Sequence, residues 1–195
     1  MGKMLLGSGF APTLRNYTSG GTETIPYGAT TLVIEAWGSG GVGGSGTGSA
    51  NGGGGGGGGG YTTCTMTVAS QNGNTFTVTI PAFASGSTQI AAGTVTGFST
   101  ITAIVGSAGA SGLSGGAGGP GNGYVNTNPG ATGTTGTTGA NQSAGLGGAG
   151  GHNTSSNVTG DANTPVNSVA QGGHGGAAGS GATGGTAGGA TFYYT

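Results

Sequence analysis

The sequence predicts an all-β protein: an antiparallel β-sandwich with a large glycine-rich insertion, polyproline-II- or polyglycine-II-like, before the final strand. Three observations lead to this fold class. Short runs of apolar residues alternate with threonine, which is the period-two pattern of a half-buried strand. Glycine supplies 55 of the 195 residues, including an unbroken run at 52–60. An aromatic, strand-like segment at 190–195 follows the glycine-rich region, so we expect the chain to return to the sheet in which it began.

The nine-glycine run at 52–60 is the centre of the predicted organisation. Glycine has no side chain to bury and loses the most backbone entropy on folding. It can adopt the polyproline-II helix, which rises about 3.1 Å per residue without internal hydrogen bonds, and neighbouring runs can then bond side by side. Candidate partners are the glycine-rich blocks at 38–48, 106–123, 130–139, 145–151 and 172–189. A net hydrogen bond contributes only about 0.5–1.5 kcal/mol against about 1–2 kcal/mol of ordering entropy per residue, so such a bundle needs an adjoining β core or an oligomer.

The first part of the chain contains one lead-in and one clear strand. Residues 1–21 are predicted to be an attachment segment or an edge strand. A turn signal follows at 24–28, and residues 31–37 read as a strand with Leu32, Ile34 and Ala36 on one face. Trp37 at its end is expected in the core or a subunit interface, with ligand stacking as the alternative.

The middle of the chain reads as further strands. Residues 61–68 and 76–80 alternate apolar and threonine positions around Asn72-Gly73, which predicts an antiparallel hairpin. Weaker strands are expected at 88–92 and 94–98, and a better one at 100–105. The region 106–189 offers no strand apart from 123–125. The predicted organisation is therefore a lead-in at 1–21, a sandwich from 22–105 and 190–195, and a glycine-rich insertion at 106–189 with polar loops.

Charge and cysteine content exclude several classes of function. Lys3 and Arg15 are the only lysine and arginine residues, so the chain lacks the basic surface that neutralises phosphates, and we expect no nucleic-acid binding. Cys64 is the single cysteine, which excludes an intrachain disulfide and favours a small buried apolar role. No apolar run approaches the length of a membrane span, so we expect no membrane insertion.

The few chemically active residues do not form a catalytic pattern. Glu23, Glu35 and Asp161 are the only carboxylates, and solvated or strand-end positions are expected for Glu23 and Glu35. A metal ion could be bound in a symmetric oligomer by His152, His174 and Asp161, but surface-loop histidines are the simpler interpretation. Nucleophile-elbow and phosphate-loop motifs are absent from the sequence. We therefore expect a protein that is not an enzyme and has no cofactor and no bound metal.

The order of these segments resembles the glycine-rich domains of bacteriophage tail fibres and tail-spike adhesins. The resemblance covers roughly residues 22–195. It is carried by the opening strand Thr-Ile-Pro-Tyr-Gly-Ala-Thr-Thr-Leu-Val-Ile-Glu-Ala-Trp-Gly-Ser-Gly-Gly (24–41), the polyglycine block before Tyr61, the strand 76–80, Ile-Val-Gly-Ser-Ala-Gly (104–109) and the closing Gly-Gly-Ala-Thr-Phe-Tyr-Tyr-Thr (188–195). The predicted β hairpin departs from the simplest polyglycine-II adhesins, which leaves both a receptor-binding tip and a structural spike component open.

The resemblance implies a virion protein that recognises and attaches to the host surface through loops on a glycine scaffold. Its expected partners are a homo-oligomer, with a trimer favoured, other virion fibre or tail proteins, and a host surface glycan or outer-membrane protein. Two polar interruptions of the glycine pattern supply the candidate receptor-binding residues: Tyr124, Asn126, Asn128, His152, Asn153, Asn157, Asp161, Asn163 and Asn167. The alternatives are a structural virion component without receptor contact (spike, decoration or connector protein) and an ice-binding bundle, against which the irregular threonine spacing argues.

Overall fold

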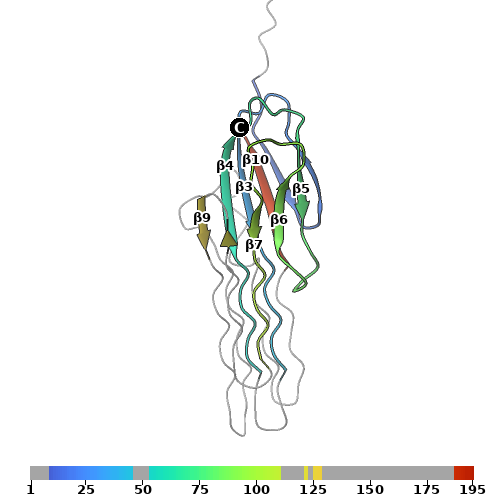
Figure 1. The fold of residues 1–195 in the computed structure, drawn as a ribbon, viewed down its shortest axis with the longest axis vertical. Helices are drawn as coiled ribbons and strands as arrows, with labels where there is room; N and C mark the ends of the chain where they lie inside the picture. Colours follow the sequence, from blue (N-terminus) through green and yellow to red (C-terminus); the bar gives the residue numbers. More distant parts are fainter. Residues whose placement is uncertain (1–8, 46–52, 111–120, 123–124, 129–186) are drawn as a thin grey trace, which may run out of the picture.

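The protein is a two-sheet antiparallel β-sandwich, and every regular element in the part that the computed structural model describes is a strand (Figure 1). The described residues are 9–45, 53–110, 121–122, 125–128 and 187–195. The first sheet, sheet A, has the order β1 (Thr13–Tyr17), β10 (Gly189–Tyr194), β3 (Thr31–Trp37), β4 (Tyr61–Thr67) and β9 (Val125–Asn128). The second, sheet B, has the order β2 (Gly21–Thr24), β5 (Thr75–Thr79), β6 (Thr88–Ala92), β7 (Ile101–Ala103) and β8 (Gly121–Asn122). The predicted all-β sandwich is confirmed, whereas most of the predicted insertion at 106–189 lies outside the described residues.

The last strand closes the first sheet. β10 lies between β1 and β3, antiparallel to both, and pairs Phe192 with Ile34 of β3. The chain therefore returns after the glycine-rich region to the sheet in which it began, as the closing aromatic segment predicts. β1 makes Thr13–Tyr17 an edge strand, so the sandwich begins before residue 22.

The predicted hairpin between 61–68 and 76–80 is wrong. β4 pairs with β3 and β9, whereas β5 pairs with β2 and β6, so Asn72-Gly73 lies in a loop that crosses from one sheet to the other. Each of the two strands has an apolar face, and these faces meet across the sandwich instead of lying side by side in one sheet. Cys64 and Val68 from β4 and Phe76 and Val78 from β5 are all buried in the same core.

Three smaller expectations also need correction. Residues 94–98 form bends and not a strand, because Thr75 accepts backbone hydrogen bonds from Gly93, Thr94 and Val95 in place of ladder pairing. β7 is limited to Ile101–Ala103 within the predicted 100–105. Of the strand expected at 123–125, Val125 begins β9, while residues 123 and 124 lie outside the described part of the chain.

The core lies between the sheets and follows the period-two pattern. Leu32, Ile34 and Ala36 of β3 are fully buried, and Cys64 is buried as predicted. Aromatic rings join the layers: Phe76 of sheet B and Phe192 of sheet A lie 5.7 Å apart between centroids. Burial of each large apolar side chain stabilises the fold by about 1.5–3 kcal/mol.

Candidate functional site

Three glycine-rich segments leave the same end of the sandwich as direct continuations of its strands (Figure 1). Segment 38–45 follows β3, segment 53–60 leads into β4, and segment 104–110 follows β7. β3 and β4 are neighbours in sheet A, and β7 of sheet B packs against β4. The sandwich therefore sets the starting positions of all three segments, which we call the glycine stem.

A ring of backbone hydrogen bonds holds the glycine stem together. Segment 38–45 donates to 53–60, segment 53–60 donates to 104–110, and segment 104–110 donates back to 38–45. The donors recur at every third residue, which fits the three residues per turn of a polyproline-II helix. They are Gly38, Gly41 and Gly44, then Gly54, Gly57 and Gly60, then Gly106 and Gly109, at donor–acceptor distances of 2.8–3.2 Å.

The same three-residue spacing decides where a side chain is forbidden. A Cβ added to Gly56 would lie 2.2 Å from the carbonyl oxygen of Gly41, and one added to Gly41 would lie 2.1 Å from that of Ser107. The other glycines at which a Cβ would overlap stem backbone in this way are Gly38, Gly44, Gly53, Gly59, Gly106 and Gly109. None of them has positive φ. Glycine is required in the stem because the backbones approach closely, and not for a special dihedral angle.

The central segment of the stem is enclosed on all sides. Every residue of 53–60 is buried, whereas Val42, Ser45 and Ser107 in the flanking segments are exposed. This arrangement confirms that the polyglycine run finds backbone partners within 38–48 and 106–123. The blocks at 130–139 and 145–151 lie outside the described residues, as does nearly all of 172–189.

A loop of sheet B supports the base of the stem. Between β5 and β6, the backbone N–H of Ala84 donates to the Ser39 hydroxyl at 3.3 Å, and the Ser87 hydroxyl accepts from the N–H of Val105 at 3.4 Å. Ala84 has φ 55°, a left-handed value that costs a non-glycine residue about 1–2 kcal/mol. The loop thus ties two stem segments to the sandwich.

The structure places two of the predicted receptor-binding residues. Asn126 and Asn128 lie on β9, at the edge of sheet A, where Asn128 pairs with Tyr61 of β4. β9 pairs with β4 through an irregular register between Thr62 and Thr63. The remaining candidates lie outside the described residues: Tyr124, His152, Asn153, Asn157, Asp161, Asn163 and Asn167.

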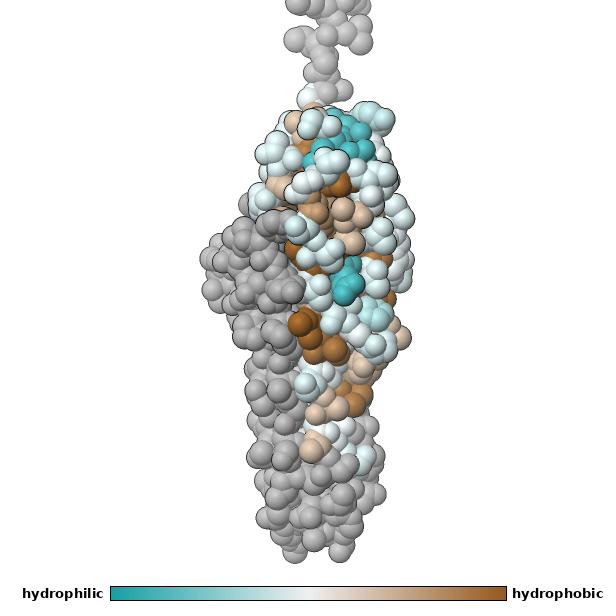
Figure 2. Space-filling view, viewed as in Figure 1, coloured by the Kyte–Doolittle hydropathy of each residue, from teal (hydrophilic) through white to brown (hydrophobic). Residues whose placement is uncertain are grey.

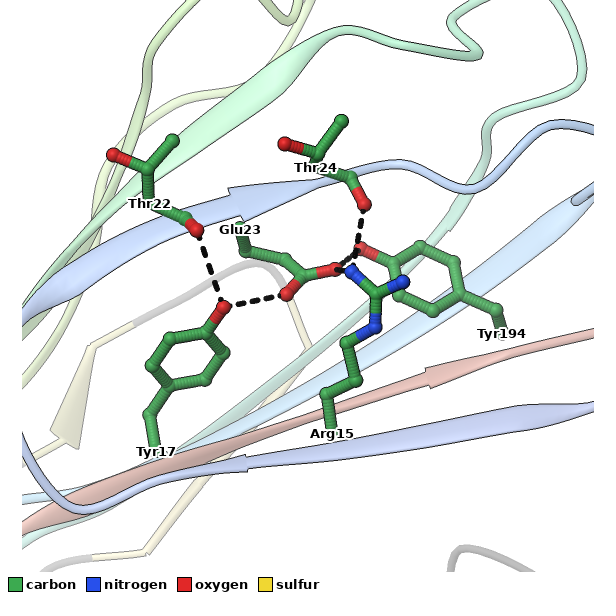
Figure 3. A network of polar contacts seen from close by, with 6 residues as sticks. All are labelled: Arg15, Tyr17, Thr22, Glu23, Thr24 and Tyr194. Atoms are coloured by element: carbon green, nitrogen blue, oxygen red, sulfur yellow. Dashed lines mark hydrogen bonds and ion pairs between the residues drawn. The ribbon is translucent and has the colours of Figure 1, made fainter.

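Glu23 lies in a buried polar network between the sheets, which corrects the expectation of a solvated or strand-end carboxylate (Figure 3). It belongs to β2 of sheet B, yet its donors come from sheet A. Arg15 Nη1 lies 2.8 Å from Oε1, the Tyr194 hydroxyl donates to Oε1 at 2.8 Å, and the Tyr17 hydroxyl donates to Oε2 at 2.6 Å. These donors replace the water that a fully buried carboxylate loses, so the network connects the two sheets.

Glu35 has a different environment. It accepts a hydrogen bond from the Tyr61 hydroxyl, and it alternates along β3 with the buried Ile34 and Ala36, which places it on the outer side of sheet A. Glu23 lies on the inner side, so these two carboxylates do not converge. Within the described residues, no group of three or more His, Cys, Asp or Glu side chains is placed to hold a metal ion.

The network predicts a loss of stability at alkaline pH. Burial, together with the hydrogen bond to Glu23 and its charge, raises the pKa of Tyr17 to about 12, and burial also raises the pKa of Tyr194. Between pH 10 and 12 the unfolded chain releases the Tyr17 proton while the folded protein retains it, so folding stability falls as pH rises through this window and is fully present below it. We expect the urea midpoint to fall from pH 9.5 to 11.5, and to fall less steeply in Tyr17→Phe. Equal slopes in the two proteins would contradict this account.

Comparison of the sequence with protein families and with curated proteins finds no relative. No protein-family model matches the chain, and no curated protein sequence matches it. Among the described residues, no helix has the length and apolar character needed to cross a membrane. Arguments about function therefore rest on the geometry above and on the resemblance found in the sequence.

Proposed function

We propose that the protein is a bacteriophage virion protein, a fibre or spike component that recognises and attaches to the host-cell surface. The observation that carries this proposal is the glycine stem: three segments, cross-linked by period-three hydrogen bonds, that extend the sandwich from one end. Such a scaffold requires almost no side chains, so the sequence between its segments is free to vary in loops that contact a receptor.

The composition supports an extracellular, assembled role of this kind. The formal net charge is -1 and only 3% of the residues are charged, so long-range electrostatics contributes little to partner choice. The Asn, Ser and Thr residues at 152–169, together with the single carboxylate Asp161, suit contact with a glycan or with an outer-membrane protein loop. A homotrimer and other virion proteins are the proposed partners, since fibres are built from repeated subunits.

Cell binding tests the proposal. The purified full-length chain is labelled and incubated with intact cells of candidate bacterial hosts, alongside a variant in which residues 152–169 are replaced by a Gly-Ser linker of equal length. We expect saturable binding to a host strain, competition with phage adsorption, and loss of both in the linker variant. Binding that survives the replacement would overturn the role of 152–169.

The second candidate is a structural virion component without receptor contact. The observation that favours it is the buried Glu23 network and the enclosed stem, since both stabilise the protein and neither presents a ligand site. Two results together would support this candidate and exclude the first. The correctly folded protein would bind no host strain, and phage particles that lack the protein would still adsorb normally.

A further inference from the structure

Three loops lie together at the end of the sandwich opposite to the glycine stem (Figure 1). They comprise residues 25–30, 69–74 and 93–98, and we call them the apical loops. Backbone hydrogen bonds join the first two: Ile25 donates to Asn74 and Gly73 donates to Ile25, both at 2.9 Å. The Gln71 side chain joins the second to the third, because its Oε1 accepts from the N–H of Thr96 at 2.8 Å and its Nε2 donates to the Thr96 carbonyl at 3.2 Å. The apex is therefore an ordered platform.

Each apical loop depends on a glycine with positive φ. Gly28, Gly73 and Gly97 have φ of 93°, 82° and 70°, and they are the positive-φ glycines of the described residues. In the first loop, Ala29 donates to the Pro26 carbonyl, so Pro26–Ala29 is a β-turn with Gly28 in the third position, where a type II turn requires positive φ. This leaves Tyr27 at the corner of the turn.

Tyr27 is displayed on this platform. Its side chain is 83% exposed, far more than any other large aromatic or aliphatic residue described; Val42 on the stem, at 37%, is next. The turn that carries it is fixed from below, because Phe10 packs against Gly28, and from the side, because the Tyr27 hydroxyl lies beside Gly73. The turn is thus anchored, while the ring that it carries remains in water.

The polar side chains of the apical loops are uncharged. The apical loops contain Ser, Thr, Asn and Gln and no charged residue, and Figure 2 shows hydrophilic residues, in teal, gathered at this end of the molecule. The Asn72 side chain belongs to the loop itself, because its Oδ1 is buried and its Nδ2 donates to the Ala69 carbonyl. A Tyr with Ser, Asn and Gly on rigid loops is the composition of many recognition surfaces.

We propose that the apical loops bind a neutral saccharide. A sugar ring has an apolar C–H face, which stacks on an aromatic ring, and a rim of hydroxyls, which exchange hydrogen bonds with amides and hydroxyls. The sugar ring stacks on Tyr27, and the exposed hydroxyl-bearing residues of the apical loops, which include Ser70, Thr94 and Thr96, supply polar contacts. The absence of charge from the apical loops disfavours acidic sugars. This site is built from residues other than 152–169 and does not rest on the function proposed above.

Saccharide binding by the full-length protein tests this site. The protein is applied to an array of immobilised neutral and acidic oligosaccharides, and the best neutral ligand is then titrated calorimetrically. We expect Tyr27→Ala to lower the affinity by about tenfold or more, a change of about 1.4 kcal/mol. Tyr27→Phe, which keeps the ring, is expected to stay within about threefold of wild type, and Val42→Ala, at the other exposed apolar residue, is expected to bind as wild type does.

Circular dichroism spectra are used to check that each variant is folded. We expect them to be unchanged, because the Tyr27 side chain is mostly outside the core. The proposal is overturned if the folded protein binds no neutral saccharide, if it prefers acidic ones, or if Tyr27→Ala binds as tightly as wild type. A protein partner captured through Tyr27 in the absence of saccharide binding would also overturn it.

Discussion

Gly56→Ala is expected to cost at least about 3 kcal/mol in stem stability, the upper end of the usual overpacking penalty. The added methyl would lie 2.2 Å from the Gly41 carbonyl oxygen and 2.6 Å from that of Val42. The Val42 oxygen accepts from the N–H of Gly109, and the N–H of Gly41 donates to Gly57, so neither residue can move without breaking a bond of the ring. The residue lies in the middle of the enclosed segment 53–60, where no surface is near to relieve the overlap.

Unfolding in urea, followed by fluorescence, measures this effect. Trp37 is the single tryptophan, is 7% exposed and immediately precedes the stem, so its emission reports on the junction. Gly9→Ala is the matched control, because a Cβ at Gly9 meets nothing within 4 Å, and it is expected to leave the midpoint unchanged. A Gly56→Ala protein as stable as the Gly9→Ala control would show that segment 53–60 is not packed between its neighbours.

Arg15→Met is expected to destabilise the protein by about 2–3 kcal/mol. Removal of one partner of a buried ion pair leaves an uncompensated charge, which costs about 3–5 kcal/mol when both partners are buried. Here Glu23 is fully buried but the Arg15 side chain is 41% exposed, so the loss is expected below that range. The Tyr17 and Tyr194 hydroxyls still donate to the Glu23 carboxylate in this variant, which limits the loss of stability.

The double variant Arg15→Met/Glu23→Gln separates charge from packing. It removes both charges and keeps a hydrogen-bonding side chain: the amide oxygen accepts from one tyrosine hydroxyl, and the amide nitrogen donates to the hydroxyl oxygen of the other. We therefore expect it to recover most of the lost stability. Chemical denaturation at pH 7 of the wild type, the two single variants and the double variant gives a double-mutant cycle, which measures the interaction between the two residues. Additive losses in the double variant would mean that Arg15 and Glu23 do not act as a pair.

The sequence predicts strand identity better than strand pairing. Alternation along 31–37 and 88–92 identifies β3 and β6, because burial of one face is a local property of the strand. Asn72-Gly73 suggests a hairpin, but the same dipeptide also turns a chain that crosses between sheets. The choice depends on whether the apolar faces of β4 and β5 pack against each other or against third elements, and that information is not local.

The three-residue spacing of the stem glycines is difficult to recognise in the sequence. Over the whole chain, glycine lacks a strict three-residue period, yet Gly38, Gly41 and Gly44 and then Gly106 and Gly109 keep one within each segment. The run at 52–60 hides the register because every position is glycine, and only the structure shows which third of them faces a neighbouring backbone.

The burial of Glu23 is not predicted from the sequence, because its hydrogen-bond donors at residues 15, 17 and 194 are not neighbours that a local pattern could reveal. Tyr27 was missed as a surface feature, although its place between Pro26 and Gly28 marks the corner of a turn.

Amide hydrogen exchange of the wild-type protein, resolved by residue, tests the central claim that backbone hydrogen bonds hold the glycine stem together. The account predicts slow exchange at the stem donors Gly38, Gly41, Gly57, Gly60 and Gly106, well below the rate of an unstructured glycine chain. The core strand β3 provides the internal standard for protection. Exchange of all these glycine amides at unstructured rates, while β3 stays protected, would contradict the account and leave the sandwich as the only ordered part of this region.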